Sequence, residues 1–314
     1  MKSFAILATF LAGVFFSSGA PITLEDISPH LSANAAIIWQ ASMNDLPKSF
    51  WIYKKSPQTF SATTISNAII LASFQKKGFP KPSTHQITIW GDHMEGEPEP
   101  PYFSILPETG QMSFTLGDRG PQAPELISTN EAAVQKAWDC LAQLRMDRSQ
   151  FMKTNEVASG GYGVFLPRQI DGIEVYGGLE GFQVQLAGQK VVAFCLLFPN
   201  LNRDKEDAIA TPQQIIACIR AHKTPSLPQG DEPDYFGRIK NLANVKKLTI
   251  VKMTPYYSEG IYGDAPTNGE SPKIVLPIAE LEAVADFGTS NTTVKLLSPI
   301  LSSEARRLPS EQTK

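Results

Sequence analysis

The stretch from Gly163 to Asn200 constrains the fold most, because it holds the longest uninterrupted pattern of strands and turns in the sequence. The Asp-Gly pair at 171–172 indicates a tight reversal, since glycine accepts a positive φ without steric cost. Residues 182–186 alternate apolar side chains with glutamines, a period of two that predicts a strand. Residues 191–198 are almost continuously apolar, so we expect a strand that is central in its sheet and covered on both faces.

Helix start signals lie on both sides of this stretch. Ser61 precedes an apolar stripe at helical spacing, as does either Thr129 or Ser128, and Thr211-Pro212 combines an N-cap with a first-turn proline. Other strand patterns lie at 50–53, 86–90, 102–106, 111–116, 245–254, 273–278, 280–287 and 292–300. This order predicts an α+β fold, in which antiparallel sheets are packed by helices in two to three helix-plus-meander units.

The first 20 residues read as a signal peptide. Lys2 precedes an apolar run at 4–16, and the small residues Ser18-Gly19-Ala20 follow it. The run is shorter than the roughly 20 residues that a spanning helix needs. We therefore expect a secreted protein that has no membrane contact once the signal peptide is removed.

The remaining chain is predicted to divide into three α+β units and a tail. The N-terminal unit covers 21–120 and opens with a loosely tied arm at 21–48. The central unit covers 127–222 and includes a charged connector at 202–207. The C-terminal unit covers 223–301, with a helix at 235–243 and a long loop at 255–269, and residues 302–314 are expected to form a flexible tail.

Three phrases of the central unit carry a family resemblance. They are Arg168-Gln-Ile-Asp-Gly-Ile-Glu-Val, Gly181-Phe-Gln-Val and Gly188-Gln-Lys-Val-Val. This pattern resembles PepSY-like domains, which include the propeptides of thermolysin-type and fungalysin-type secreted proteases. It also resembles a family of uncharacterised secreted proteins of fungi and bacteria. The resemblance implies a small antiparallel sheet packed against helices and used for inhibition, chaperoning or binding. Unlike the protease precursors, this chain is expected to carry no protease after the domain.

Sequence motifs for the common enzyme chemistries are absent. The chain has no His-Glu-x-x-His zinc motif, no Gly-x-Ser-x-Gly elbow, no phosphate loop and no dinucleotide fingerprint. We therefore expect no catalytic residue, no metal and no cofactor. A net charge of −3 provides no basic field, so nucleic acid is not an expected partner. His85 and His93, with Asp92 and Glu95, would line a loop cation site, but their being surface residues of a polar loop explains them better, because no helical or strand spacing pre-organises them.

The candidate binding residues are Arg168, Asp171 and a group of tyrosines. An arginine among strand residues needs a partner, which Asp171 or an acidic partner protein would supply. Asp171 and Glu174 flank the turn, where Asp171 either accepts the N–H groups of the turn or takes part in acid/base chemistry. Tyr256, Tyr257 and Tyr262 lie on the expected loop, where they either recognise a peptide or sugar or fold back over the sheet.

Two residue types bear on a secreted protein. Cys140, Cys195 and Cys218 are an odd number of thiols, so either a Cys195–Cys218 bridge forms or all three are buried free thiols. Asn291-Thr292-Thr293 is an N-glycosylation motif that a eukaryotic secretory pathway would use.

Together these features predict a secreted, non-enzymatic binding or inhibitory module whose partner is a secreted protein or peptide. The alternative is a secreted hydrolase of unfamiliar type, in which Asp92, His93 and Glu95 would face Asp171 across a cleft.

Overall fold

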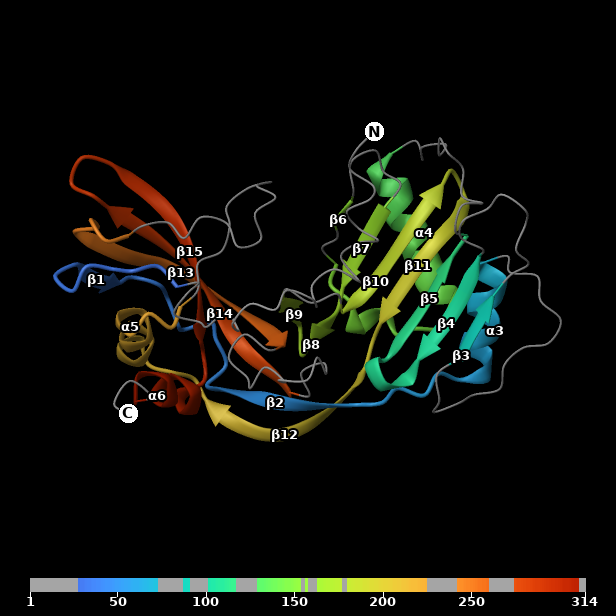
Figure 1. Ribbon diagram of the computed structural model, residues 1–314, viewed down its shortest axis with the longest axis horizontal. Helices are drawn as coiled ribbons and strands as arrows, with labels where there is room; N and C mark the ends of the chain where they lie inside the picture. Colours follow the sequence, from blue (N-terminus) through green and yellow to red (C-terminus); the bar gives the residue numbers. More distant parts are fainter. Residues whose placement is uncertain are drawn as a thin grey trace, which may run out of the picture.

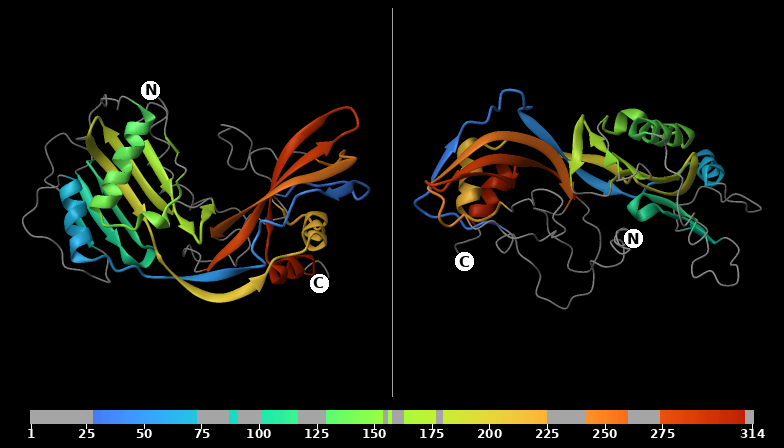
Figure 2. Two further views of the ribbon diagram at one scale, coloured as in Figure 1. Left: turned by 180° about the vertical axis from the view of Figure 1, so that it is seen from behind. Right: turned by 90° about the horizontal axis from the view of Figure 1, so that it is seen from above.

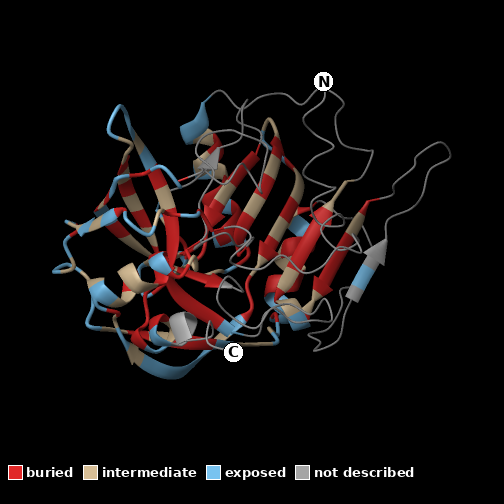
Figure 3. Cartoon of the chain, turned by 60° about the vertical axis from the view of Figure 1, so that its left-hand side comes forward, coloured by how far each residue is buried: buried red, intermediate tan, exposed pale blue. Residues whose placement is uncertain are grey.

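The structure, a computed structural model, describes residues 28–72, 87–90, 101–116, 129–153, 156–157, 163–176, 180–224, 242–259 and 274–310. It confirms the predicted α+β class: within these residues the strands form an eight-stranded sheet, named sheet A, and a seven-stranded sheet, named sheet B. The two sheets lie side by side, and each packs its own helices (Figure 1). Buried residues concentrate in the strands of both sheets (Figure 3).

Sheet B is antiparallel throughout. Its strand order is β3 (Ile87–Trp90), β4 (Tyr102–Leu106), β5 (Gln111–Thr115), β11 (Lys190–Leu197), β10 (Gly181–Ala187), β7 (Gly163–Pro167) and β6 (Glu156–Val157). The predicted central position of β11 is confirmed. Its burial alternates, however: Phe194 and Leu196 are buried, and Cys195 between them is only half-buried. The expectation that both faces are covered is therefore wrong.

Two helices cover the apolar face of sheet B. They are α3 (Ala62–Leu71) and α4 (Asn130–Gln143), which lie on the same side of the sheet (Figure 2). The predicted N-cap at Ser61 is confirmed, since its hydroxyl accepts from the Thr64 N–H at 3.0 Å. Of the two candidates for α4, Thr129 is the cap, and its hydroxyl accepts from the Ala132 N–H at 3.1 Å. Short 3₁₀ turns at Pro107–Thr109 and Arg148–Gln150 complete this half of the molecule.

Sheet A combines strands from both ends of the chain. Its main path is β12 (Asn200–Ala208), β2 (Ser49–Ser56), β14 (Ile274–Asp286), β13 (Lys247–Glu259), β9 (Ile173–Tyr176) and β8 (Gln169–Ile170), with β1 (Ala36–Trp39) added to β13 and β15 (Asn291–Pro299) to β14. Two of its pairings, β1 with β13 and β13 with β9, are parallel, so the sheet is mixed rather than purely antiparallel. The two strands predicted at 273–278 and 280–287 are one strand, β14.

Helices α5 (Pro212–Arg220) and α6 (Ser302–Ser310) pack on each other and on β15. The predicted start of α5 is confirmed, since Thr211 and Gln214 form a reciprocal capping box. Buried residues of α5, among them Ile215 and Ile219, join β13, β14 and β15 in one hydrophobic core, which is separate from the core under sheet B.

A two-stranded ribbon of β2 and β12 runs between the sheets (Figure 1). β2 leaves sheet A and leads into α3, whereas β12 follows β11 of sheet B directly after Phe198 and Pro199. Each sheet therefore takes strands from more than one of the three predicted units.

The turn between β4 and β5 touches both crossing segments. The Gln58 N–H donates to the Pro107 carbonyl at 2.8 Å, and the Phe198 N–H donates to the Gly110 carbonyl at 2.9 Å. Gly110 has φ +67°, and a Cβ placed on it would lie 2.3 Å from the Pro199 nitrogen. Only glycine fits this close approach without a shift of backbone.

Several segments differ from the expectation. The arm at 21–48 contains β1, the connector at 202–207 belongs to β12, and the tail at 302–314 begins as α6. β12 has mostly exposed side chains, and most of these are charged or polar, which suits the solvated edge of a sheet and leaves no hydrophobic pattern that would reveal the strand. α6 is ordered by packing, since its Ala305 is buried against α5 and accepts from the Cys218 thiol at 3.5 Å.

Some predictions fall outside the described residues, namely the signal peptide at 1–20 and most of the helix at 235–243, whose residues 235–241 are not described. Within the described part of the chain, every helix is too short or too polar to cross a lipid bilayer.

Candidate functional site

The sequence-predicted residues Arg168, Asp171 and Tyr257 meet where the two sheets join. The β8–β9 hairpin leaves β7 of sheet B and adds to β13 of sheet A, which places Val175 opposite Tyr257. We call this region the junction. Its residues are Tyr53, Lys55, Arg168, Asp171, Glu180 and Arg203, with the aromatic residues Trp51, Phe198 and Tyr257 beside them.

The Asp171-Gly172 reversal forms as predicted. Both residues have positive φ, +51° for Asp171 and +82° for Gly172, which is typical of the type I′ turn of a tight hairpin. A Cβ on Gly172 would meet no atom within 4 Å, so the tip of the hairpin is open. The turn presents the Asp171 carboxylate toward β2 and β12.

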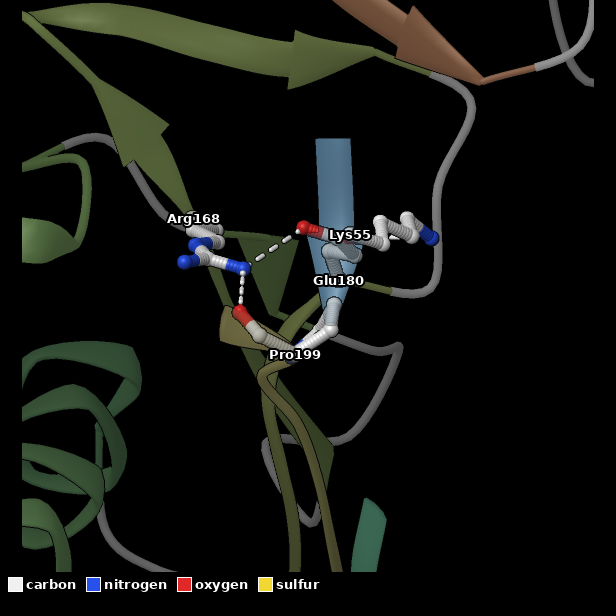
Figure 4. A network of polar contacts seen from close by, with 4 residues as sticks. All are labelled: Lys55, Arg168, Glu180 and Pro199. Carbon is white, nitrogen blue, oxygen red and sulfur yellow. Dashed lines mark hydrogen bonds and ion pairs between the residues drawn. The ribbon is translucent and has the colours of Figure 1, made fainter. Parts of the chain in front are cut away.

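Arg168 lies in a buried polar network (Figure 4). Its Nη1 donates to Glu180 Oε2 at 3.0 Å and to the Pro199 carbonyl at 2.8 Å. Lys55 Nζ lies 3.0 Å from the other oxygen of Glu180, whose side chain is 0% exposed. The Arg168 guanidinium also covers the Phe198 ring, 3.9 Å from its centroid. These charged side chains therefore link β2 of sheet A to the end of β7 and the start of β10 in sheet B.

The expected partner of Arg168 was wrong. Asp171 does not pair with Arg168, and Arg168 is too buried to contact a separate protein directly. Sequence reasoning missed Glu180, although the register contains the signal. Pro167 pairs with Gly181 in the antiparallel β7–β10 ladder, so the next residues along, Arg168 and Glu180, stand opposite each other. The Arg168 N–H donates to the Glu180 carbonyl at 3.1 Å.

Asp171 belongs to a second, more open cluster. The Tyr53 hydroxyl donates to Asp171 Oδ2 at 2.7 Å, and Arg203 Nη2 lies 3.6 Å from Asp171 Oδ1. The Arg203 guanidinium also lies over the Trp51 ring, 5.1 Å from its centroid. β12 and β8 are the two ends of the main path of sheet A. The Arg203–Asp171 contact therefore joins residues from opposite ends of the sheet.

The tyrosines of the junction remain protonated at neutral pH. Burial raises the pKa of Tyr53, and its hydrogen bond to Asp171 raises it further. Burial also raises the pKa of Tyr257 far above its usual value, with the nearby Tyr53 and Asp171 adding to the effect. The two rings meet edge to face, with centroids 5.5 Å apart. The protonated Tyr53 hydroxyl is therefore available as the hydrogen-bond donor to Asp171.

The expected tyrosine loop is partly a strand. Residues 255–259 belong to β13, which makes Tyr257 a core residue with 1% exposure and Tyr256 a half-buried one. The pKa of Tyr256 is raised by burial and then by the nearby carboxylates Glu280 and Glu174. The expectation of exposed contact is wrong for Tyr257, and Tyr262 lies outside the described residues.

The other candidates lie away from the junction. Asn291 is exposed at the start of β15. His30 and His222 approach each other near the end of α5, with ring centroids 4.8 Å apart. Among the described residues, no three His, Cys, Asp or Glu side chains gather as a metal site would require. The loop with Asp92, His93 and Glu95, and with it His85, falls outside those residues.

The three cysteines are free thiols, so the Cys195–Cys218 bridge is wrong. Cys195 belongs to sheet B, whereas Cys218 lies on α5 beside sheet A. Burial raises the pKa of Cys140 and Cys195 to about 11 and that of Cys218 to about 12. Thiols with such pKa values are protonated at neutral pH and are poor nucleophiles.

Comparisons with known proteins give little that resembles this chain. No family model matches it, and no curated protein matches it. Among solved structures, it is similar to the Bacillus megaterium YpeB C-terminal domain, with 11% sequence identity and a TM-score of 0.30, over 74% of this chain and 89% of that chain.

Proposed function

We propose that this chain is a secreted, non-enzymatic binding or inhibitory protein that recognises another secreted protein or peptide through the junction. The observation that carries the proposal is the exposed pair of Asp171 and Arg203, which lies beside the half-buried Trp51. The side chains of Arg203 and Asp171 are 55% and 50% exposed, and they come from elements far apart in the chain.

The chemistry of this cluster suits recognition. Arginine and tryptophan are enriched at the energetic centres of protein interfaces. Stacking on Trp51 and pairing with Asp171 hold the Arg203 guanidinium in place, which lowers the entropy that binding would cost. A guanidinium fork is matched by a carboxylate, so we expect the partner to present an Asp or Glu side chain or a chain terminus.

The charged groups behind the cluster support binding rather than chemistry. Arg168, Glu180 and Lys55 are engaged with one another, and Tyr53 is engaged with Asp171. A general base must be free to take a proton from a substrate near neutral pH. Within the described residues, the junction presents tyrosines of raised pKa and a carboxylate that already accepts a hydrogen bond. The signal-peptide pattern of residues 1–20 supports the proposal that the protein is secreted.

A comparison of variants in one capture experiment tests the proposal. The immobilised chain is incubated with culture fluid of its source, and captured proteins are identified by mass spectrometry. Arg203→Glu and Asp171→Asn should each weaken capture of the true partner at least about tenfold, because they reverse or remove a charge of the cluster. Lys54→Ala is the matched control, since Lys54 lies on the same ribbon in an exposed pair with Asp204.

Two results would contradict the proposal. One is a partner that all variants capture equally. The other is a chain that captures nothing but hydrolyses a panel of peptide or glycoside substrates, which would favour the alternative of an unfamiliar hydrolase.

A further inference from the structure

Strand β1 forms an apolar edge of sheet A. Its residues are Ala36-Ile37-Ile38-Trp39, and within the described part of the chain it pairs with β13 alone, in parallel. It lies at the end of sheet A away from sheet B, and so away from the junction (Figure 1).

The backbone hydrogen bonds of β1 show which side of the strand is open. The Ala36 N–H donates to the Lys246 carbonyl at 2.8 Å, and the Gln40 N–H donates to the Ile250 carbonyl at 2.9 Å. Successive residues of a strand direct their backbone groups to opposite sides. Ile37 and Trp39 therefore direct their N–H and C=O groups away from β13, where no described strand pairs with them.

Two apolar side chains at this edge are exposed. Ile38 is 39% exposed, and Val251 on the neighbouring β13 is 38% exposed. Ile38 stands opposite Thr249, and Val251 follows two residues later, at the register shift between Ile250 and Lys252 of β13. Native edges are usually protected by charge, as β12 is, but β1 has no charged residue.

We propose that β1 is a dimerisation edge, where two copies of this chain pair in antiparallel fashion about a two-fold axis. The best register places Ile38 opposite Ile38 of the partner subunit. Ile37 then stands opposite Trp39 of the partner subunit, and these outward-directed residues exchange N–H···O bonds as a hydrogen-bonded pair. The result is one continuous sheet made from two copies of sheet A.

A second copy matches this edge in burial and in charge. In the proposed register the exposed Ile38 meets its own copy, at a Cα separation of about 4.5 Å. The half-buried Ile37 meets the half-buried Trp39. The absence of charge on β1 means that two identical strands meet without like-charge repulsion. An isologous pairing also closes at two subunits and does not grow into a fibre.

Sedimentation equilibrium of the purified chain tests the proposal. The chain should be a dimer, and Ile38→Lys should weaken dimerisation at least about tenfold, because it places two like charges opposite each other. Ile70→Lys is the control: Ile70 is 58% exposed on α3, so this variant should remain a dimer. Ile37→Pro is a second disrupting variant, since it removes an outward N–H and leaves the β1–β13 bonds in place.

Cross-linking checks the register. Ile38→Cys should form a covalent dimer under mild oxidation, because the two-fold axis brings the new thiols together, whereas Ile70→Cys should not. The three natural thiols are protected by their raised pKa. A wild-type chain that stays monomeric overturns the proposal, as does a dimer that survives both Ile38→Lys and Ile37→Pro. So does a monomer that binds an extended foreign peptide at β1.

Discussion

At the residue scale, the buried Arg168–Glu180 pair has a different energetic role from the exposed pairs of the ribbon. Removing one member of a buried pair leaves an uncompensated charge, and this typically costs about 3–5 kcal/mol. Glu180→Ala should therefore lower the free energy of unfolding by about that amount, because it strands Arg168 and Lys55. Urea denaturation followed by tryptophan fluorescence measures the change.

The exposed Lys54–Asp204 pair is the control for this prediction. Its nitrogen–oxygen distance is 2.7 Å, shorter than in the buried pair, yet the Lys54 side chain is 59% exposed. Asp204→Ala should cost less than about 1 kcal/mol. If both variants lost the same free energy of unfolding, the cost of removing Glu180 would not come from its burial.

The buried thiols predict alkaline destabilisation. The pKa values of Cys140 and Cys218 rise from 9.0 to about 11 and about 12 in the folded chain. A raised pKa means that the folded state holds the proton longer, so this stability is complete below pH 9 and is lost as the pH rises from 9 toward 12. Each thiol contributes up to about 1.4 kcal/mol per pH unit there.

Urea unfolding at a series of pH values measures this loss. Cys218→Ala should make the dependence above pH 9 shallower, and native thiols should react slowly with a thiol reagent at pH 8. A stability that is constant up to pH 11, or rapid labelling of all three thiols, would be incompatible with the buried positions.

Asn291 is predicted to accept a glycan when the chain passes through a eukaryotic secretory pathway. It is exposed at the first residue of β15, and Thr293 of the motif is exposed as well. Treatment with an amidase that removes N-glycans should shift the mass of the wild type and leave Asn291→Gln unchanged. A wild-type chain without such a shift would refute the prediction.

At the scale of elements, the β4–β5 turn secures the crossings between the sheets. Gly110→Ala would force a Cβ to within 2.3 Å of the Pro199 nitrogen at a φ of +67°. We expect a loss of more than about 2 kcal/mol, because strain and a backbone clash act together.

Gly172→Ala is the matched control, because Gly172 also has positive φ, +82°, but has free space around it. It should cost only about 1 kcal/mol, the strain of the left-handed conformation. Thermal denaturation of both variants separates the cost of backbone strain from the cost of the clash with Pro199. A larger loss of stability in Gly172→Ala than in Gly110→Ala would contradict the importance of the close approach.

The elements that sequence could predict are those with a local signal. Ser61, Thr129 and Thr211 cap helices with their own side chains. The Asp171-Gly172 pair favours a tight turn through its own backbone preferences. The strand β12 and the helix α6 lack such a signal, since their order comes from β2 and α5, which lie far away in sequence.

Only the part of the candidate site that has a local signal could be predicted from the sequence. Arg168 and Asp171 belong to one short hairpin, whose residues the sequence brings together. Tyr53 and Arg203 come from distant strands, and only the curl of sheet A places them beside Asp171. A tertiary contact of this kind has no pattern within a single stretch of sequence.

At the scale of the whole molecule, two hydrophobic cores share one polar junction. Because Arg168, Glu180 and Lys55 connect the two halves, we expect the wild-type chain to unfold in one cooperative transition. Glu180→Ala should separate this into two transitions, one for each core. Hydrogen exchange followed by mass spectrometry can assign β11 and β14 to their transitions. If both strands still lose protection together in the variant, the cores are coupled by other contacts.

Sheet A has one more consequence, which concerns synthesis. Its strands β1 and β2 emerge from the ribosome early, whereas β13, β14 and β15 follow about two hundred residues later. A growing chain must therefore keep Ala36-Ile37-Ile38-Trp39 soluble until its neighbours arrive. No contiguous fragment shorter than residues 36–299 contains all the strands of sheet A, so two pieces divided between β2 and β13 would have to reassemble before either recovers this half of the fold.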